Sequence, residues 1–138
     1  MSNSPLILLL IDDNPEDREY YTQLLRTSLP DAFVLHTSTG QSGLAFCELR
    51  TVDCVVLEID LPDMSGFDVL QKLTPRVEHP EIAAIVLTGL SNQSLLEATI
   101  EGGAQFAFHK NMVTADILST AVLKAISTVR KDRKRVAA

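Results

Sequence analysis

The stretch Val55–Gly66, VVLEIDLPDMSG, begins as a buried strand and ends in a turn. Its first part is apolar and rich in β-branched residues, which is typical of a strand covered on both faces of a parallel sheet. Pro62 and Gly66 then interrupt the run. Two carboxylates, Glu58 and Asp60, stand at the junction. An acid in a segment that reads as buried needs a chemical reason, because burying a charge is costly.

Apolar runs of this kind alternate with amphipathic segments along the whole chain. The runs are Leu6–Ile11, Phe33–His36, Cys54–Ile59, Ile82–Leu87 and Ala104–Phe108. The segments with helical spacing are Pro15–Leu29, Gly40–Arg50, Gly66–Leu73, Asn92–Glu101 and Ala115–Arg130. Three of these helices follow a capping side chain: Asn14, Ser65 and Thr114. Five strand–helix units predict a three-layer α/β sandwich, with helices on both faces of a parallel sheet.

The chain has the length and composition of one globular domain. Its 138 residues are 46% hydrophobic, and we assign residues 1–129 to that domain and residues 130–138 to a basic C-terminal helix end or tail. The longest apolar run is far too short to cross a bilayer and the start lacks a secretion signal, so we expect a cytoplasmic protein with no membrane partner. Cys47 and Cys54 have no spacing for zinc or redox chemistry and are read as core thiols.

The net charge of −6 is unevenly distributed. Residues 130–135 hold five of the twelve basic residues and one acid, which leaves seven basic and seventeen acidic residues in the rest. An acidic body repels nucleic acid and no DNA-binding segment follows the last helix, so we expect no direct contact with nucleic acid. The basic end alone could attract it, but a short basic run is more often a solvated helix end.

Polar side chains gather where the predicted strands end. The ends of the first, third, fourth and fifth strands carry acids, a hydroxyl and an ammonium group: Asp12, Asp13, Glu58, Asp60, Thr88 and Lys110. The carboxyl ends of parallel strands meet at one rim, where open α/β sheets bind their ligands. Carboxylates gather around a cation, and hard oxygen ligands suit Mg²⁺, while a lysine and a threonine complete a site for a phosphoryl group. The alternative is that each acid caps only the loop or helix that follows it.

These motifs resemble the receiver domain of bacterial two-component response regulators. The resemblance covers Leu6 to about Val129 and rests on IDDNPEDRE, LPDMSGFDVL, VLTG and GGAQFAFHK, in this order and spacing. It implies a flavodoxin-like (βα)5 fold with strand order 2-1-3-4-5, and an acceptor aspartate that is phosphorylated by a histidine kinase. The residue roles that it implies are Mg²⁺ ligation by Asp12, Asp13, the acid at position 58 and the backbone carbonyl of Asp60, and phosphoryl contacts from Thr88 and Lys110.

The acceptor position is where this chain departs from the family. It lies four residues before the Pro of LPDMSG and holds Glu58 instead of an aspartate. The additional methylene moves the carboxylate by on the order of an ångström, and catalysis by positioning is sensitive to such a displacement. We therefore expect ordinary phosphotransfer to be slow or absent, with Asp60 as a less favoured acceptor.

Further departures lie around the last strand. The family commonly has a switching aromatic three residues before the lysine, and that position is Ala107 here. Its neighbours Phe106 and Phe108 are read as core packing. Asn111 replaces a frequent proline, and His109 is read as an ordinary strand-edge histidine, with a titrating sensor as the alternative. The side chain that usually transmits phosphorylation is therefore missing.

Two interpretations of Glu58 follow. Either it imitates part of the charge of a phosphorylated aspartate, pairs with Lys110 and holds one conformation, or the site is a relic on a docking or dimerisation surface. In both, the chain is a signalling module that binds a histidine kinase, another signalling protein or a second copy, and is not an enzyme. The alternative is a Mg²⁺-dependent small phosphatase or another flavodoxin-like enzyme, but a phosphatase of the haloacid dehalogenase type has DxD where this chain has Glu58-Ile59-Asp60.

Overall fold

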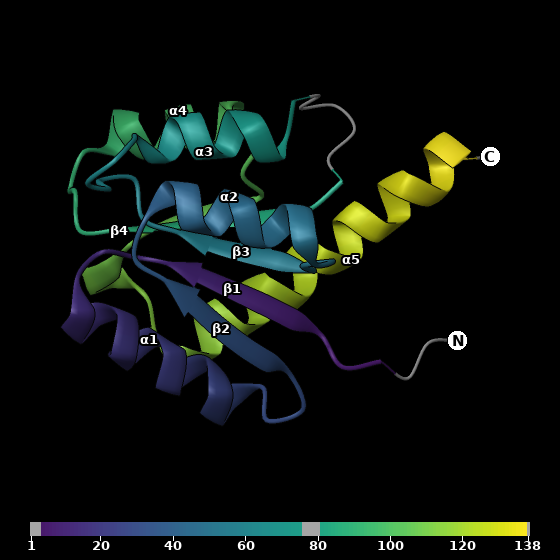
Figure 1. Ribbon diagram of the computed structural model, residues 1–138, viewed down its shortest axis with the longest axis horizontal. Coiled ribbons are helices and arrows are strands. Elements are labelled where there is room, and N and C mark those ends of the chain that lie inside the picture. Colours follow the sequence, from purple (N-terminus) through teal and green to yellow (C-terminus); the bar gives the residue numbers. More distant parts are fainter. Residues whose placement is uncertain (1–3, 76–80, 138) are drawn as a thin grey trace.

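The computed structural model describes residues 4–75 and 81–137, the last three of them by backbone alone, and forms a five-stranded parallel sheet in the order β2-β1-β3-β4-β5 (Figure 1). The strands are β1 Ile7–Ile11, β2 Phe33–Thr37, β3 Cys54–Leu57, β4 Ala83–Thr88 and β5 Phe106–His109. The helices are α1 Pro15–Ser28, α2 Gly40–Leu49, α3 Gly66–Leu73, α4 Gln93–Glu101 and α5 Ala115–Ala137, with a short 3-10 helix η1 Lys110–Met112. The predicted flavodoxin-like fold and strand order are confirmed.

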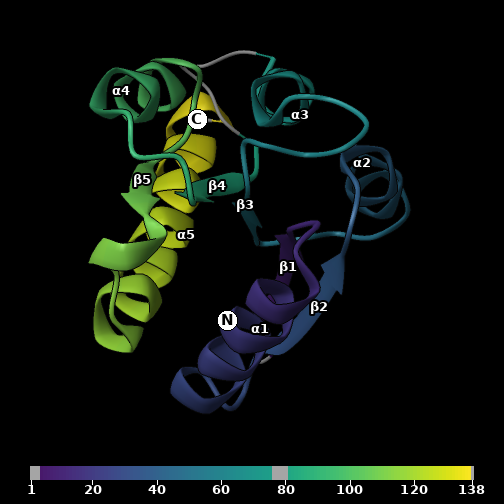
Figure 2. The same cartoon turned by 90° about the vertical axis from the view of Figure 1, so that its left-hand side faces the viewer.

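Helices cover both faces of the sheet, with α1 and α5 on one side and α2, α3 and α4 on the other (Figure 2). Side chains alternate between these two layers along each strand. On β1, Leu8 and Leu10 pack with α1 and α5, whereas Leu9 and Ile11 pack with the opposite layer, and none of the four is more than 1% exposed. Full burial of such a side chain stabilises the fold by roughly 1.5–3 kcal/mol. Strand β1 is therefore anchored on both faces and holds its polar end in place.

The helices start at the caps that the sequence predicts. The side chains of Asn14, Ser65 and Thr114 each accept a hydrogen bond from a backbone N–H in the first turn of α1, α3 and α5. These bonds satisfy N–H groups that have no partner inside the helix. Because Asn14 directly follows the two acids at the end of β1, its cap also fixes how the chain leaves the rim.

Strand β3 ends two residues before the predicted end at Ile59. The backbone N–H of Ile59 donates to the Glu58 carboxylate at 2.7 Å, and the Ile59 carbonyl accepts from the N–H of Gly66 at 2.7 Å. The side chain of Glu58, at the expected end of the strand, takes a backbone N–H that a longer strand would use. The other strands, and the helices apart from α5, agree with the predicted bounds within one or two residues.

Helix α5 continues past its predicted end at Arg130 and runs through the basic segment, so that its last turns extend beyond the sheet (Figure 1). Arg130 pairs with Asp53 at 3.3 Å, and Arg133 donates to the backbone carbonyl of Glu81. The basic segment is therefore a helix end partly tied to the body, and the side chain of Arg135 lies outside the described residues. Within the described part of the chain, no helix is both long and apolar enough to span a membrane.

Candidate functional site

At the carboxyl edge of the sheet, the ammonium group of Lys110 lies among three carboxylates. The Lys110 Nζ atom lies 2.7 Å from Asp12 Oδ2 and 3.1 Å from Glu58 Oε1. Asp12 and Glu58 are only 1% and 6% exposed. A third carboxylate reaches in from the first turn of α1, where Asp17 Oδ2 lies 2.8 Å from the same Nζ atom. Lys110 is thus the counter-ion of two buried acids and of one half-buried acid.

Lys110 is held as a cation. Burial by itself favours the neutral amine, but hydrogen bonds to Asp12 and Asp17 outweigh it and raise the pKa of Lys110. Tyr21 on α1 fixes the backbone at the same point, because its hydroxyl donates to the Lys110 carbonyl at 3.3 Å and its ring centroid lies 6.0 Å from Nζ. The ammonium group therefore stays charged and in place at neutral pH.

The carboxylate of Glu58 is surrounded by donors. They are the backbone N–H groups of Ile59 (2.7 Å), Asp60 (3.2 Å) and Gly89 (3.2 Å), the hydroxyl of Thr88 and the ammonium of Lys110. Burial alone raises the pKa of Glu58, but these bonds, led by that of Thr88, outweigh burial and lower the pKa. Glu58 is therefore an ionised, buried carboxylate with both oxygens engaged.

Asp12 is also fully engaged. Its Oδ1 accepts from the N–H of Asn14 at 3.0 Å, and its Oδ2 accepts from Lys110. Burial raises the pKa of Asp12 in spite of these two bonds. Arg18 on α1 donates to the backbone carbonyl of Asp12 at 3.0 Å, which holds the loop after β1 against the helix.

The last strand has no aromatic switch, as its sequence predicts. Phe106 and Phe108 stack with ring centroids 6.0 Å apart and pack against the core beneath α1 and α5, which confirms their interpretation as core packing. Ala107 points to the opposite layer. His109, read as an ordinary strand-edge histidine, has partners on both ring nitrogens: the Gly89 carbonyl lies 3.2 Å from Nε2, and the N–H of Asn111 lies 3.2 Å from Nδ1.

Asp17 is the site residue that sequence reasoning missed. An acid in the first turn of a helix normally reads as a complement to the helix dipole, so nothing local singles it out. The available signal is its position, because a helix that starts directly after the acids of β1 places its first turn over the rim. Lys110 and Asp17 are far apart in the chain, and only the tertiary fold joins them, because α1 packs beside α5 and reaches Lys110.

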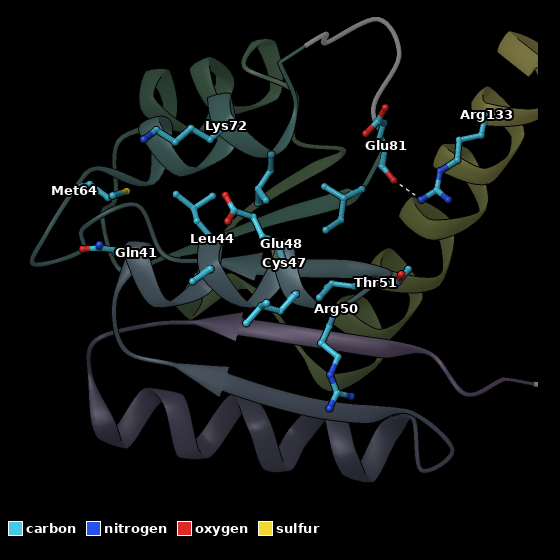
Figure 3. A pocket seen from close by; sticks show the side chains of 15 residues that line it. Gln41, Leu44, Cys47, Glu48, Arg50, Thr51, Met64, Lys72, Glu81 and Arg133 are labelled. Atoms are coloured by element: carbon cyan, nitrogen blue, oxygen red, sulfur yellow. Dashed lines mark hydrogen bonds between the residues drawn. The ribbon is translucent and has the colours of Figure 1, made fainter.

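A broad hollow of about 880 Å³ lies elsewhere, between α2 and α3 (Figure 3). Leu44 and Leu73 contribute apolar surface to it. Its charged lining residues are of both signs: Arg50, Lys72, Arg133, Glu48 and Glu81. None of the residues that line it belongs to the acidic rim, so the hollow is separate from the predicted site.

Comparison with known proteins decides the family. A family model of the response regulator receiver domain matches residues 8–122. The chain belongs to this family. The "Probable transcriptional regulatory protein TcrX" of Mycobacterium tuberculosis is 38% identical over 85 residues, which are 61% of this chain and 34% of TcrX. The "Nitrate/nitrite response regulator protein NarL" of Escherichia coli is 31% identical over 120 residues, which are 86% of this receiver and 54% of NarL.

Solved structures agree with this assignment. A response regulator receiver domain from Clostridium thermocellum superposes with a TM-score of 0.77 at 29% identity, over 96% of this chain and 99% of that one. The chain is thus a receiver domain of two-component signalling, a class of signalling module. It spans only about a third of TcrX and about half of NarL.

Receiver domains typically bind Mg²⁺ at this acidic pocket, and the side chains present can be tested for that role. The oxygens of Asp12 and Glu58 already accept from Lys110 and from N–H groups, while Asp13 and Asp60 are exposed at the rim. Among the residues that the structure describes, no group of three or more His, Cys, Asp or Glu side chains is placed to hold a metal ion. In this arrangement Lys110 is already a counter-ion of Asp12 and Glu58, so a bound Mg²⁺ would have to compete with its ammonium group for their oxygens.

Proposed function

We propose that this receiver works without phosphorylation, or with weak phosphorylation at most, as a fixed-state module that binds another protein. The observation that carries the proposal is the residue at the acceptor position. Glu58 replaces the family's aspartate, and its carboxylate is already bound by backbone N–H groups, by the Thr88 hydroxyl and by Lys110.

The chemistry of acyl phosphate formation supports this view. A carboxylate that attacks a phosphoryl group must present a free lone pair along the line of attack. Glu58 would have to leave its hydrogen bonds to do so, and the donors that stabilise a phosphoryl group would have to leave Glu58. A small phosphatase that uses the same carboxylate as its nucleophile faces the same obstacle. We therefore favour a binding module over an enzyme.

The charge of Glu58 supports a fixed conformation of the receiver that only partly resembles the phosphorylated one. An acyl phosphate carries roughly two negative charges and three additional oxygens, whereas a carboxylate carries one charge and two oxygens. Glu58 nevertheless holds Lys110, Thr88 and the backbone of Gly89 together. In our proposal the receiver rests permanently in the state that these contacts define, and Mg²⁺ binds weakly because Lys110 already neutralises the acids.

The partner that we propose is a protein of a two-component pathway, either a histidine kinase or another signalling protein, with a second copy of the chain as the alternative. The acidic body argues against direct contact with nucleic acid, although the names of TcrX and NarL describe regulators. We place the protein in the cytoplasm, where the kinase domains and response regulators of such pathways meet.

The proposal is tested by intact-protein mass spectrometry after incubation with Mg²⁺ and a small acyl-phosphate donor. The wild type and Glu58→Asp are compared, since the aspartate restores the family's acceptor and shortens the side chain by one methylene. We expect the Asp variant to gain one phosphoryl group and the wild type to gain none.

The control is Glu58→Gln, which keeps the size of the side chain but is not expected to accept a phosphoryl group. A wild-type protein that is modified as fast as the Asp variant contradicts the proposal. Peptide mapping then shows whether Glu58 or the neighbouring Asp60 is the acceptor.

A further inference from the structure

The ring of His109 joins two segments that follow neighbouring strands. Its Nδ1 accepts from the N–H of Asn111 at 3.2 Å, at the start of η1. Because Nδ1 accepts, the proton of the neutral ring lies on Nε2, and Nε2 donates to the carbonyl of Gly89 at 3.2 Å. The parallel register places His109 directly opposite Thr88, so the ring crosses from β5 to the loop after β4.

The same loop is held from its other side by Glu58. The backbone N–H of Gly89 donates to the Glu58 carboxylate at 3.2 Å, and the Thr88 hydroxyl accepts from the N–H of Leu90 at 3.1 Å. The N–H of Leu90 and the carbonyl of Gly89 belong to one peptide unit, and that carbonyl is the one that His109 binds. Hydrogen bonds therefore connect the carboxylate, through the backbone of Gly89 and the imidazole of His109, to η1.

We propose that His109 is a positioning residue that couples the carboxylate of Glu58 to the end of β5 and to η1. This inference rests on the proposed function, in which Glu58 sets the state of the domain. Ala107, at the position of the family's switching aromatic, has only a methyl group and points to the opposite layer. The imidazole supplies a connection of a different kind, which depends on two hydrogen bonds rather than on a change of rotamer.

The two segments that His109 joins carry exposed apolar side chains. Leu90, after β4, is 38% exposed, and Met112, in η1, is 74% exposed. Exposed apolar side chains are favoured contacts for a protein partner. Through its two hydrogen bonds, His109 fixes the position of the loop after β4 relative to η1. Both segments also contact the carboxylate of Glu58, the loop through the N–H of Gly89 and η1 through the side chain of Lys110.

A second route from Glu58 to η1 exists and has to be separated from the first. Lys110 contacts Glu58 through its side chain and begins η1 through its backbone. Asp17 touches Lys110 at 2.8 Å, and none of its contacts involves the loop after β4. Asp17→Asn therefore perturbs the Lys110 route and leaves the hydrogen bonds through Gly89 intact.

The test is a long-range ¹H–¹⁵N spectrum of the histidine rings in the full chain, recorded at about pH 8.5, well above the ordinary histidine pKa of about 6.5. For His109 we expect the Nε2–H tautomer with no detectable Nδ1–H form. Glu58→Asp and Thr88→Ala should each shift the ring nitrogens of His109. His36, exposed on the edge strand β2, is the internal control and should not move.

Three results overturn the inference. They are a populated Nδ1–H tautomer of His109, ring nitrogens that stay unchanged in both Glu58→Asp and Thr88→Ala, and a shift in Asp17→Asn as large as that in Glu58→Asp. The spectra are recorded without a phosphoryl donor. Their outcome is therefore independent of whether the wild type accepts a phosphoryl group, and the two proposals can fail separately.

Discussion

Replacing Lys110 with methionine tests whether this ammonium group is the counter-ion of the buried acids. The Nζ atom lies within 2.7–3.1 Å of Asp12, Asp17 and Glu58. Methionine keeps an unbranched side chain of similar length and removes the charge. The substitution therefore takes away the cation with little change in packing.

The expected loss follows from the burial of each acid. Removing one partner of a buried ion pair costs about 3–5 kcal/mol, because the other charge is left without compensation. The side chain of Asp17 is 41% exposed, and its pair contributes at most about 1 kcal/mol. Glu58 keeps its backbone donors, so we expect the lower end, a loss of about 3 kcal/mol at pH 7 and a Tm lower by roughly 10 °C.

The assay is urea denaturation followed by far-UV circular dichroism, with both proteins measured across a range of pH. The pKa of Lys110 is raised above its ordinary value of 10.5, so its contribution is complete below pH 10.5 and disappears as the pH rises through the folded-state pKa. At acid pH the uncompensated carboxylates of the variant take up protons. The difference in the free energy of unfolding between the wild type and Lys110→Met should therefore be largest near neutral pH and should decrease toward both acid and alkaline pH.

The control is Lys124→Met, an exposed lysine of α5, which should change the free energy of unfolding by less than about 0.5 kcal/mol. The reasoning is refuted if Lys110→Met costs less than about 1 kcal/mol, the value of an exposed pair. It is refuted equally by a difference that stays constant from acid to alkaline pH.

Two further predictions concern backbone packing and the thiols. In Gly66→Ala the new Cβ atom would lie 2.6 Å from Ile59 Cα and 2.7 Å from the Glu58 carbonyl, so urea denaturation should show a loss of about 1–3 kcal/mol. Gly89→Ala, whose nearest contact is 4.0 Å away, is the control, and an equal loss in both would contradict the steric explanation. Burial raises the pKa of Cys47 from 9.0 to about 11, so a thiol reagent at neutral pH should modify it about a hundredfold more slowly than a free thiol. Cys54, which is fully buried, should react only after unfolding, and rapid modification of either thiol in the folded protein would count against their interpretation as core residues.

Much of the fold follows from local patterns in the sequence. Apolar runs such as Cys54–Leu57 lack polar alternation because both faces of the strand are covered, and that feature is visible without any structure. The helix caps at Asn14, Ser65 and Thr114 are equally local. The point at which β3 ends was not predictable in the same way. It depends on a side chain that folds back onto the next backbone N–H.

Part of the candidate site was likewise predictable from the sequence, and part depended on the tertiary structure. The convergence of Asp12, Glu58 and Lys110 follows from strand ends meeting at one rim, and the structure brings these three side chains together. Asp17 and His109 act through partners that are distant in the chain, and their local sequence fits a helix-dipole residue and a strand-edge histidine equally well. Only the packing of α1 and the register of β4 with β5 reveal their contacts.

The central claim is that the wild-type receiver does not change its conformation in response to a phosphoryl donor. The most direct measurement is a ¹H–¹⁵N spectrum of the wild type in Mg²⁺, recorded before and after addition of a small acyl phosphate, beside the same pair of spectra for Glu58→Asp. Our account predicts that the two wild-type spectra superpose, while the amide signals of Thr88, Gly89 and Lys110 move in the Asp variant. If these signals move in the wild type as they do in the variant, Glu58 is a working acceptor and the account of a fixed state is wrong.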